Sequence, residues 1–218
     1  MRTTETITAA RKKKAKMNVP NRLTVLRLAM VPIMIAVMVL PDSLVPSLVT
    51  GIIGAFLFIT AAVTDMLDGK IARKYGLVTD FGKLMDPLAD KFMVIGALTV
   101  IVYRYDNLRP VFIWALLIVM FRELAVTSLR LVASTSGGVV VPANMLGKIK
   151  TVSQIVCVSA AIIEPMLYEI PFLRDFLPEW WVTYVPLTYF TCAAMTLFTV
   201  LSGVNYFRAM WKYLDPEK

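Results

Sequence analysis

Six long apolar stretches constrain what this chain can fold into more than any other feature of its sequence. Each stretch is close to the roughly 20 residues that a helix needs to cross the hydrocarbon core of a bilayer. Unpaired backbone groups are costly in lipid, and a helix pairs them within its own segment. The sequence therefore predicts an all-α integral membrane protein with six transmembrane helices. The expected spans are residues 23–40, 48–64, 87–103, 111–132, 151–168 and 181–206.

The amino-acid composition supports the membrane prediction and excludes other classes. Hydrophobic residues make up 58% of the 218 residues, whereas soluble domains usually hold about one half. The excess lies in the long runs, which indicates contact with lipid rather than a larger core. Basic residues lie beside these runs without interleaved aromatics, so we predict no nucleic-acid partner. Cys157 and Cys192 lie in apolar stretches and are expected to be buried hydrophobes, not a disulfide or a thiolate metal site.

Three regions are expected along the chain. Residues 1–17 form a basic cytoplasmic tail beside the membrane, residues 18–212 the six-helix catalytic domain, and residues 213–218 a second cytoplasmic tail. Lysines precede the first apolar run, as they do in a signal peptide. However, that run lacks a small-x-small cleavage site and ends at Pro41-Asp42. We therefore interpret it as a retained first span.

The distribution of basic residues predicts how the helices are oriented. Short cytoplasmic loops carry an excess of Lys and Arg, so the richer side is assigned to the cytoplasm. The opposite side keeps only Arg104, Arg109 and Arg174. Both termini are then cytoplasmic, and the chain is a multi-pass protein of the cell (inner) membrane. The cytoplasmic charges are the cluster from Arg11 to Arg22, Lys70, Arg73, Lys74, Lys83, Lys148, Lys150, Arg208 and Lys212.

Four aspartates border the second and third predicted spans. Asp65 and Asp68 are three residues apart, and Asp86 and Asp90 are four apart, so each pair shares one helix face. The two spans are antiparallel neighbours joined by a short connection. Their carboxylate faces can therefore converge at one point. A solvated, helix-capping cluster is the alternative, but ionisable groups at membrane depth are usually functional.

Four converging carboxylates need a cation to compensate their charge. The chain contains no histidine, and oxygen-only ligands favour Mg²⁺, Mn²⁺ or Ca²⁺ over zinc. Four carboxylates are more than one Mg²⁺ usually recruits. We therefore expect two Mg²⁺ ions, with Mn²⁺ as a possible substitute. Paired ions of this kind stabilise the attacking and leaving oxygens in phosphoryl transfer.

The spacing of these aspartates and their neighbours resembles the signature of the CDP-alcohol phosphotransferase family. The pattern reads Asp65-x2-Asp68-Gly69-x2-Ala72-Arg73-x8-Gly82-x3-Asp86-x3-Asp90. The resemblance implies that family's fold, a homodimer of six-helix protomers, a dinuclear metal site and a CDP-linked lipid donor. It also implies that all four aspartates face the metals and that Asp90 is the catalytic base. Gly69, Arg73 and Thr79 would contact the nucleotide diphosphate.

The segment that opens the first span resembles the corresponding segment of bacterial phosphatidylglycerophosphate synthases in that family. It reads Asn18-Val19-Pro20-Asn21-Arg22-Leu23-Thr24-Val25-Leu26-Arg27. The resemblance makes Asn21 and Thr24 candidate contacts of CDP-diacylglycerol. A second interpretation has Asn21 or Thr24 capping the helix, with Arg22 and Arg27 as lipid-facing anchors. The two interpretations are compatible.

Basic residues near the fourth and fifth spans are candidates for binding an anionic acceptor. Arg122, Arg130 and Lys148 could bind its phosphate from the cytoplasmic side. The Arg122-Glu123 pair could also simply neutralise itself. Lys148 and Lys150 could equally determine topology, and for Lys150 we favour that interpretation.

The expected function is transfer of the phosphatidyl group from CDP-diacylglycerol to glycerol 3-phosphate, which yields phosphatidylglycerophosphate and CMP. The same chemistry with inositol phosphate, serine or phosphatidylglycerol as acceptor is the first alternative. A cation transporter that uses the carboxylates as a relay is a remote alternative. Against it, the carboxylates lie at one membrane face, and no acidic path crosses to the other.

Overall fold

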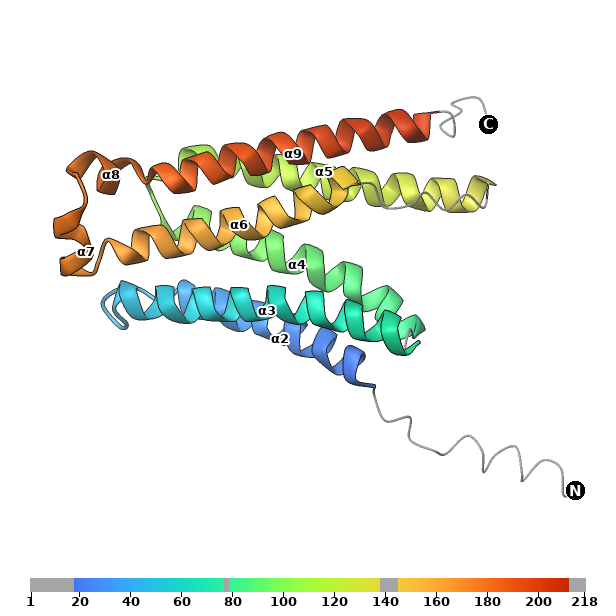
Figure 1. Cartoon of the computed structure of the whole chain (residues 1–218), viewed down its shortest axis with the longest axis horizontal. Coiled ribbons are helices and arrows are strands. Elements are labelled where there is room, and N and C mark those ends of the chain that lie inside the picture. Colours follow the sequence, from blue (N-terminus) through green and yellow to red (C-terminus); the bar gives the residue numbers. More distant parts are fainter. Residues whose placement is uncertain (1–17, 77–78, 138–144, 212–218) are drawn as a thin grey trace, which may run out of the picture.

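Helices make up the whole regular structure of the described residues. The computed structural model describes residues 18–76, 79–137 and 145–211, and this part contains no strand (Figure 1). The all-α part of the predicted fold class is therefore confirmed. The helices are α2 (Val19–Met38), α3 (Ser47–Tyr75), α4 (Asp80–Arg104), α5 (Arg109–Gly137), α6 (Met145–Leu167), α7 (Pro171–Phe176), α8 (Glu179–Tyr184) and α9 (Pro186–Met210). The predicted tails, 1–17 and 213–218, lie outside the described residues.

Five of the six long helices in the described part are long and apolar enough to cross a membrane. The exception is α4, whose first half carries Asp80, Asp86, Asp90 and Lys91. The predicted third span, 87–103, begins with this charged segment and continues into the apolar second half of the helix. The protein is thus a multi-pass membrane protein, in which α4 combines an apolar half with a charged one.

The last predicted span is wrong at its beginning. Residues 181–206 were expected to form one helix, but α8 ends at Tyr184 and α9 begins at Pro186. Val185 between them has a φ of 42°, in the left-handed region that β-branched residues rarely adopt. Pro186 has no N–H to continue the preceding helix, so the chain turns here before α9 starts.

The long helices run side by side and place their ends in two groups. At one end, here called the site end, α2, α4 and α6 begin and α3, α5 and α9 finish; α7 and α8 lie at the other end (Figure 1). Helix α2 packs against α3 and α4, while α6 packs against α3 and α9. Glycines allow some of these approaches, because a Cβ at Gly54 would lie 2.6 Å from the Met38 sulfur.

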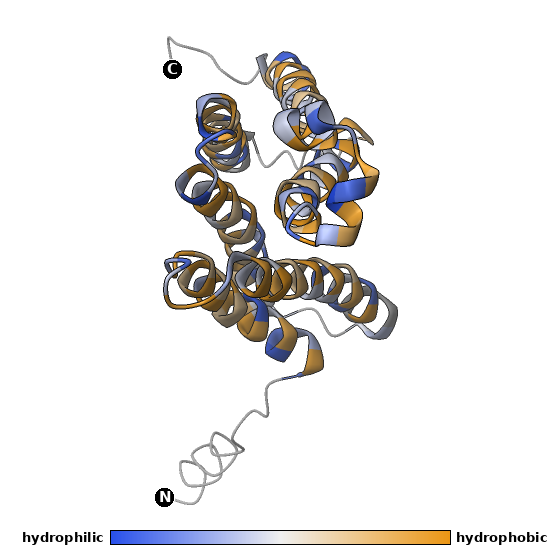
Figure 2. Ribbon diagram, turned by 90° about the vertical axis from the view of Figure 1, so that its left-hand side faces the viewer, coloured by the Kyte–Doolittle hydropathy of each residue, from blue (hydrophilic) through white to orange (hydrophobic). Residues whose placement is uncertain are grey.

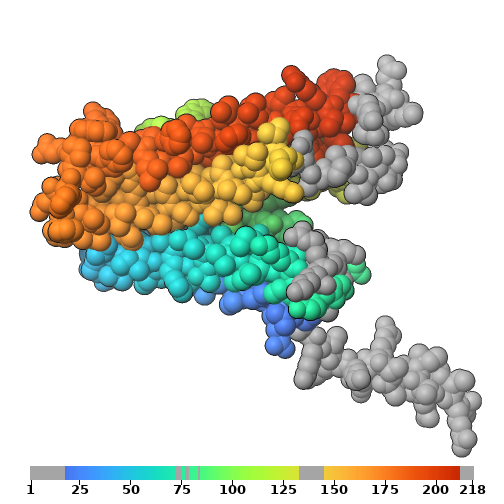
Figure 3. All heavy atoms as spheres, viewed as in Figure 1, coloured from blue at the N-terminus to red at the C-terminus, as the bar shows by residue number. Residues whose placement is uncertain are grey.

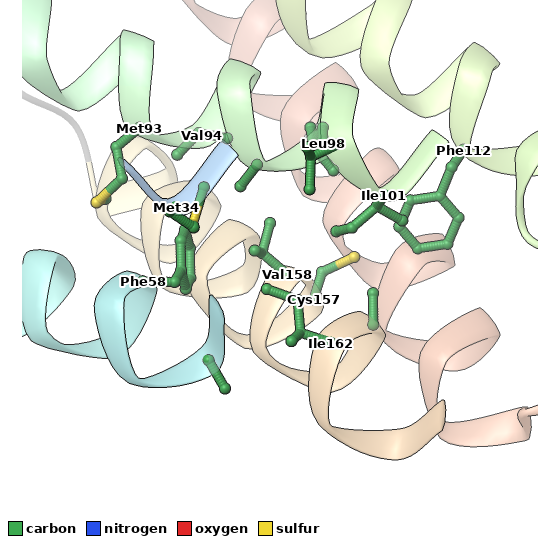
Figure 4. Packing of buried hydrophobic residues seen from close by; sticks show 14 of the residues in the cluster. Met34, Phe58, Met93, Val94, Leu98, Ile101, Phe112, Cys157, Val158 and Ile162 are labelled. Atoms are coloured by element: carbon green, nitrogen blue, oxygen red, sulfur yellow. The ribbon is translucent and has the colours of Figure 1, made fainter. Parts of the chain in front are cut away.

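A core of buried apolar side chains joins both halves of the bundle. Met34, Phe58, Leu98, Phe112 and Ile162 come from five different helices and are all almost fully buried (Figure 4). The two cysteines are free and buried in or beside this core, as predicted. The long helices carry apolar residues along most of their length (Figure 2). The outward-facing residues include Phe56, Trp114, Phe121 and Phe190, and a bilayer would cover such a surface.

Candidate active site

The four aspartates come together at the site end, around one arginine. Asp65 and Asp68 lie in the last third of α3, and Asp90 lies in the first half of α4. Arg27 of α2 forms ion pairs with all three, at nitrogen–oxygen distances of 2.8 Å to Asp65, 2.5 Å to Asp68 and 2.9 Å to Asp90. The predicted convergence of the two carboxylate faces is therefore present in the structure.

The fourth carboxylate belongs to the same group. The Thr24 hydroxyl donates a hydrogen bond of 2.7 Å to an Asp86 oxygen. Asp86 also lies close enough to Asp68 and Asp90 to interact with both electrostatically. These contacts define a carboxylate cluster of Asp65, Asp68, Asp86 and Asp90.

Two helix caps position the residues beside this cluster. The Asn18 side chain caps α2 by accepting from the Asn21 N–H at 3.1 Å, so the predicted cap at Asn21 or Thr24 is wrong. The Thr79 hydroxyl caps α4 by accepting from Gly82 at 3.1 Å, and it donates to the Asn21 side chain at 2.8 Å. A Cβ at Gly82 would lie 3.2 Å from the same Asn21 oxygen. Glycine here thus lets α2 and α4 approach where both begin.

Arg27 is the residue that the sequence placed wrongly. The alternative interpretation made it a lipid-facing anchor, but its side chain is 0% exposed and lies among three carboxylates. Arg22, the other proposed anchor, is exposed. The spacing could have indicated that Arg27 faces the site, because Asn21, Thr24 and Arg27 recur every three residues and therefore share one face of α2.

The predicted nucleotide contacts lie around the same cluster. Asn21 and Thr24 are buried beside α4, and Thr79 bonds to Asn21. Gly69 follows Asp68 directly and is half-buried. The side chain of Arg73 lies outside the part of the chain that the structure describes. Four of the five predicted contacts are thus placed beside the carboxylates.

A second polar cluster lies on α5 and faces α6 and α9. Arg122 bonds to Glu123 at 2.9 Å and to the Ser202 hydroxyl of α9 at 2.8 Å. Lys150 of α6 pairs with the same Glu123 oxygen that Arg122 contacts. Arg130 donates to the Tyr206 hydroxyl at 2.9 Å. We call Arg122, Glu123, Arg130 and Lys150 the basic cluster.

One sequence interpretation, that of Lys150, changes at the basic cluster. Lys150 was interpreted as a topology determinant, but it is 6% exposed and ion-paired within the bundle. Lys148, predicted to bind the acceptor, is exposed. Arg122 does pair with Glu123, as the self-neutralising alternative proposed, but Lys150 adds a second cation to that carboxylate.

The two clusters are close to each other. Lys150 interacts electrostatically with Asp90, although they belong to different helices. Lys91, next to Asp90, bonds to Thr127 on α5 and so ties α4 to the helix of the basic cluster. The space-filling view shows the molecule notched at the site end, between the end of α3 and the start of α6 (Figure 3). The notch thus lies between the helix that carries Asp65 and Asp68 and the helix that carries Lys150.

Residues 17–200 match the family model of CDP-alcohol phosphatidyltransferases, which covers most of the chain and both clusters. The chain belongs to the CDP-alcohol phosphatidyltransferase family. The resemblance seen in the aspartate spacing is confirmed.

Named relatives within this family cover almost the whole chain. A CDP-diacylglycerol–glycerol-3-phosphate 3-phosphatidyltransferase of Bacillus subtilis is 41% identical over 92% of this chain and 98% of its own length. A Rickettsia felis protein with the same name is 34% identical over 90% of this chain and 97% of its own. The protein is therefore a phosphatidyl-transferring enzyme of the CDP-alcohol family.

A solved structure supports the fold independently. The crystal structure of Mycobacterium tuberculosis phosphatidylinositol phosphate synthase with CDP-DAG bound has a TM-score of 0.55 with this chain. The likeness covers 99% of this chain and 98% of the other, at 19% sequence identity. At that identity the match concerns the arrangement of helices, and the acceptor must be argued from other evidence.

The donor chemistry of the carboxylate cluster suits a divalent ion. Its ligands are all oxygens, from four carboxylates on two neighbouring helices, and such sets favour Mg²⁺ or Mn²⁺. Three of the carboxylates already share a cation, the guanidinium of Arg27. Among the described residues, no group of three acidic side chains is arranged to hold an ion as it stands. The ligand atoms are thus of the type that a divalent metal prefers, but in this structure three of the carboxylates are arranged around the Arg27 guanidinium.

Proposed function

We propose that this enzyme transfers the phosphatidyl group of CDP-diacylglycerol to glycerol 3-phosphate, producing phosphatidylglycerophosphate and CMP. The observation that carries the proposal is the near full-length similarity, at 41% identity, to a Bacillus subtilis enzyme named for this reaction. The Rickettsia felis relative bears the same name. The basic cluster adds a physical reason, because an acceptor with a phosphate needs cations beside the carboxylates.

Asp90 is the proposed base. The primary hydroxyl of glycerol 3-phosphate attacks the lipid-side phosphorus of the donor, Asp90 takes the hydroxyl proton, and CMP leaves. A base must be within reach of the proton that it accepts. The Asp90 side chain is 49% exposed, against 31% for Asp65 and 6% for Asp68, so among these three it is the most open to an incoming hydroxyl.

Asp65, Asp68, Asp86 and Asp90 would hold two Mg²⁺ ions, for which Mn²⁺ could substitute. Bound metal would neutralise the charge that develops on the diphosphate oxygens as CMP departs. Two threonines help to position these carboxylates. Thr24 holds Asp86 in place through its hydrogen bond, and the Thr79 cap fixes the start of the helix that carries Asp86 and Asp90.

The two substrates would approach these aspartates from different helices. Asn21, Thr24, Gly69, Arg73 and Thr79 are the proposed contacts of the CDP-diacylglycerol head group. Arg122, Arg130 and Lys148 are the proposed contacts of the acceptor phosphate. Lys150 would take part indirectly, because it neutralises part of the Glu123 charge that Arg122 would otherwise neutralise alone.

We further propose that the site end faces the cytoplasm of the cell, where both termini would lie, and that the enzyme is a homodimer. Short cytoplasmic loops are enriched in Lys and Arg, and the site end carries more of them than the α7–α8 end, which keeps Arg104, Arg109 and Arg174. A cysteine placed at Lys148 should react with a membrane-impermeant maleimide only after cells are opened, and one at Asp175 should react in intact cells. The two native cysteines are buried, so they should not react with the maleimide. The mass of the purified protein in detergent tests the dimer.

Release of CMP from CDP-diacylglycerol by the purified enzyme tests the reaction. Glycerol 3-phosphate, inositol phosphate, serine and phosphatidylglycerol would be offered separately with Mg²⁺. We expect release only with glycerol 3-phosphate, and its loss in Asp86→Asn but not in Asp106→Asn, a control at the opposite end whose carboxylate is 84% exposed. Release with another alcohol would overturn the acceptor and keep the family chemistry.

A further inference from the structure

We propose that Arg27 is a built-in counter-cation which competes with divalent metal for the carboxylate cluster and so sets its metal affinity. The inference rests on the proposed metal site and adds a residue to it. Arg27 is here a positioning residue, since it acts on the aspartates and not on the reacting atoms.

The contacts of Arg27 are those of a cation matched to several anions. A fully buried guanidinium is costly unless nearby carboxylates compensate it, and here three do. One terminal nitrogen, Nη1, serves both Asp65 and Asp90, while Nη2 serves Asp68. The carboxylates come from two helices, so Arg27 holds α3 and α4 together at the site.

The shared nitrogen is the reason to expect competition. Nη1 lies within 2.9 Å of one Asp65 oxygen and one Asp90 oxygen. A divalent ion held by Asp65 and Asp90 would need the oxygens that Nη1 now contacts, because carboxylate oxygens are the ligands that Mg²⁺ prefers. The like charges of the ion and the guanidinium also repel each other. Arg27 must therefore give up at least this bridge when metal binds there.

A further detail makes such a movement feasible. The third guanidinium nitrogen, Nε, is buried and has no hydrogen-bond partner among the described residues. Arg27 is thus held only through its two terminal nitrogens. These are the nitrogens that a metal would displace, so no further hydrogen bond from the guanidinium would have to break.

Binding of Mn²⁺ to the purified, full-length enzyme, followed by electron paramagnetic resonance, tests the proposal. Arg27→Gln removes the positive charge and should tighten Mn²⁺ binding at least about tenfold, which is the lower end of what one nearby charge does to proton binding at a carboxylate. Arg27→Lys keeps a charge that cannot bridge three carboxylates, so its affinity should fall between the two. Arg22→Gln, an exposed position on the same helix, should bind as the wild type does.

Thermal unfolding supplies a second readout. In EDTA, Arg27→Gln should melt below the wild type because the carboxylates repel, and Mn²⁺ should raise its melting temperature by more than it raises that of the wild type. A merely structural role for Arg27 would lower the melting temperature without tightening metal binding. If Arg27→Gln does not fold, Arg27→Lys carries the test, and it must bind Mn²⁺ more tightly than the wild type.

The outcomes separate this inference from the proposed metal site. Mn²⁺ binding that is unchanged or weaker in the Arg27 variants overturns the competition and leaves the metal site standing. Failure of Mn²⁺ to bind either the wild type or the variants overturns both.

Discussion

The carboxylate cluster and the basic cluster are built from the same kinds of residue in opposite proportions. In the first, three carboxylates surround one arginine. In the second, Arg122 and Lys150 share the single carboxylate of Glu123, and Arg130 lies nearby on the same helix. Each cluster contains salt bridges, so counting ion pairs does not distinguish them.

The ratio of charges distinguishes the clusters. An excess of carboxylate attracts further cations, whereas an excess of cation attracts anions such as a phosphate. Helices α2, α3 and α4 supply the first cluster, and α5, α6 and α9 supply the second with its hydroxyl partners. The carboxylate half thus fits the proposed metal ions, through which it would bind the diphosphate of the donor, and the basic half fits the phosphate of the proposed acceptor.

Asp90→Asn should have the largest effect on turnover. An amide cannot take the hydroxyl proton, so we expect kcat to fall by about 10²- to 10⁴-fold. Nucleotide binding should persist, because the other three aspartates remain. CMP release and CDP titration on the same preparation check both statements. Unchanged turnover would remove Asp90 from the role of base.

Arg122→Gln, in the basic cluster, should weaken binding of the acceptor rather than slow the chemical step. Loss of a charged hydrogen bond to the acceptor phosphate should raise the KM for glycerol 3-phosphate by about 10- to 100-fold. The KM for CDP-diacylglycerol should change little. Ser202→Ala is the matched control, since it removes a partner of Arg122 and keeps the cation. A rise confined to the KM of the lipid donor would place Arg122 on the wrong substrate.

Lys148→Gln should have a smaller effect of the same kind. Lys148 is exposed, and exposed ion pairs contribute about 0–1 kcal/mol, so the KM for glycerol 3-phosphate should rise at most about fivefold. The rise should shrink as salt is added, because salt screens exposed charges. An effect larger than that of Arg122→Gln would reverse the order of the two residues.

Glu164→Ala should leave activity unaffected and lower stability. This buried carboxylate, outside both clusters, accepts from the Thr188 N–H at 2.6 Å, the Leu187 N–H at 3.2 Å and the Tyr168 hydroxyl at 2.6 Å. Leaving such donors unpaired should cost about 1–3 kcal/mol in the free energy of unfolding. Thermal unfolding in detergent measures the loss, with the exposed Glu169→Ala as control. Loss of activity in the folded protein would mean that this region acts on the site.

The sequence predicted those features that depend on local periodicity. Apolar runs predicted the long helices, and spacings of three and four residues predicted that the Asp65–Asp68 pair and the Asp86–Asp90 pair would converge. The break at Val185 was missed because the surrounding residues are as apolar as those of a continuous span.

The burial of single charges could not be predicted from the sequence. Arg27, Lys150 and Glu164 are each buried against at least one partner that lies 23 or more positions away in the chain: Asp68, Glu123 and Leu187, respectively. Taken alone, each has the character of an exposed or interfacial charge. Only the packing of other helices against them decides otherwise, and one sequence does not give that packing.

The length of α3 has a consequence for how the enzyme meets its lipid. At 1.5 Å per residue, Asp65 and Asp68 lie roughly 27 to 32 Å from the start of the helix at Ser47, about the thickness of the hydrocarbon core. With Ser47 at one face of the hydrocarbon core, the carboxylates would be level with the head groups of the opposite leaflet, and the acyl chains of CDP-diacylglycerol could stay in the bilayer throughout the proposed reaction. Encounter is then two-dimensional. The rate should follow the mole fraction of donor in the membrane, so adding inert lipid should slow the enzyme even when the total amount of donor is constant.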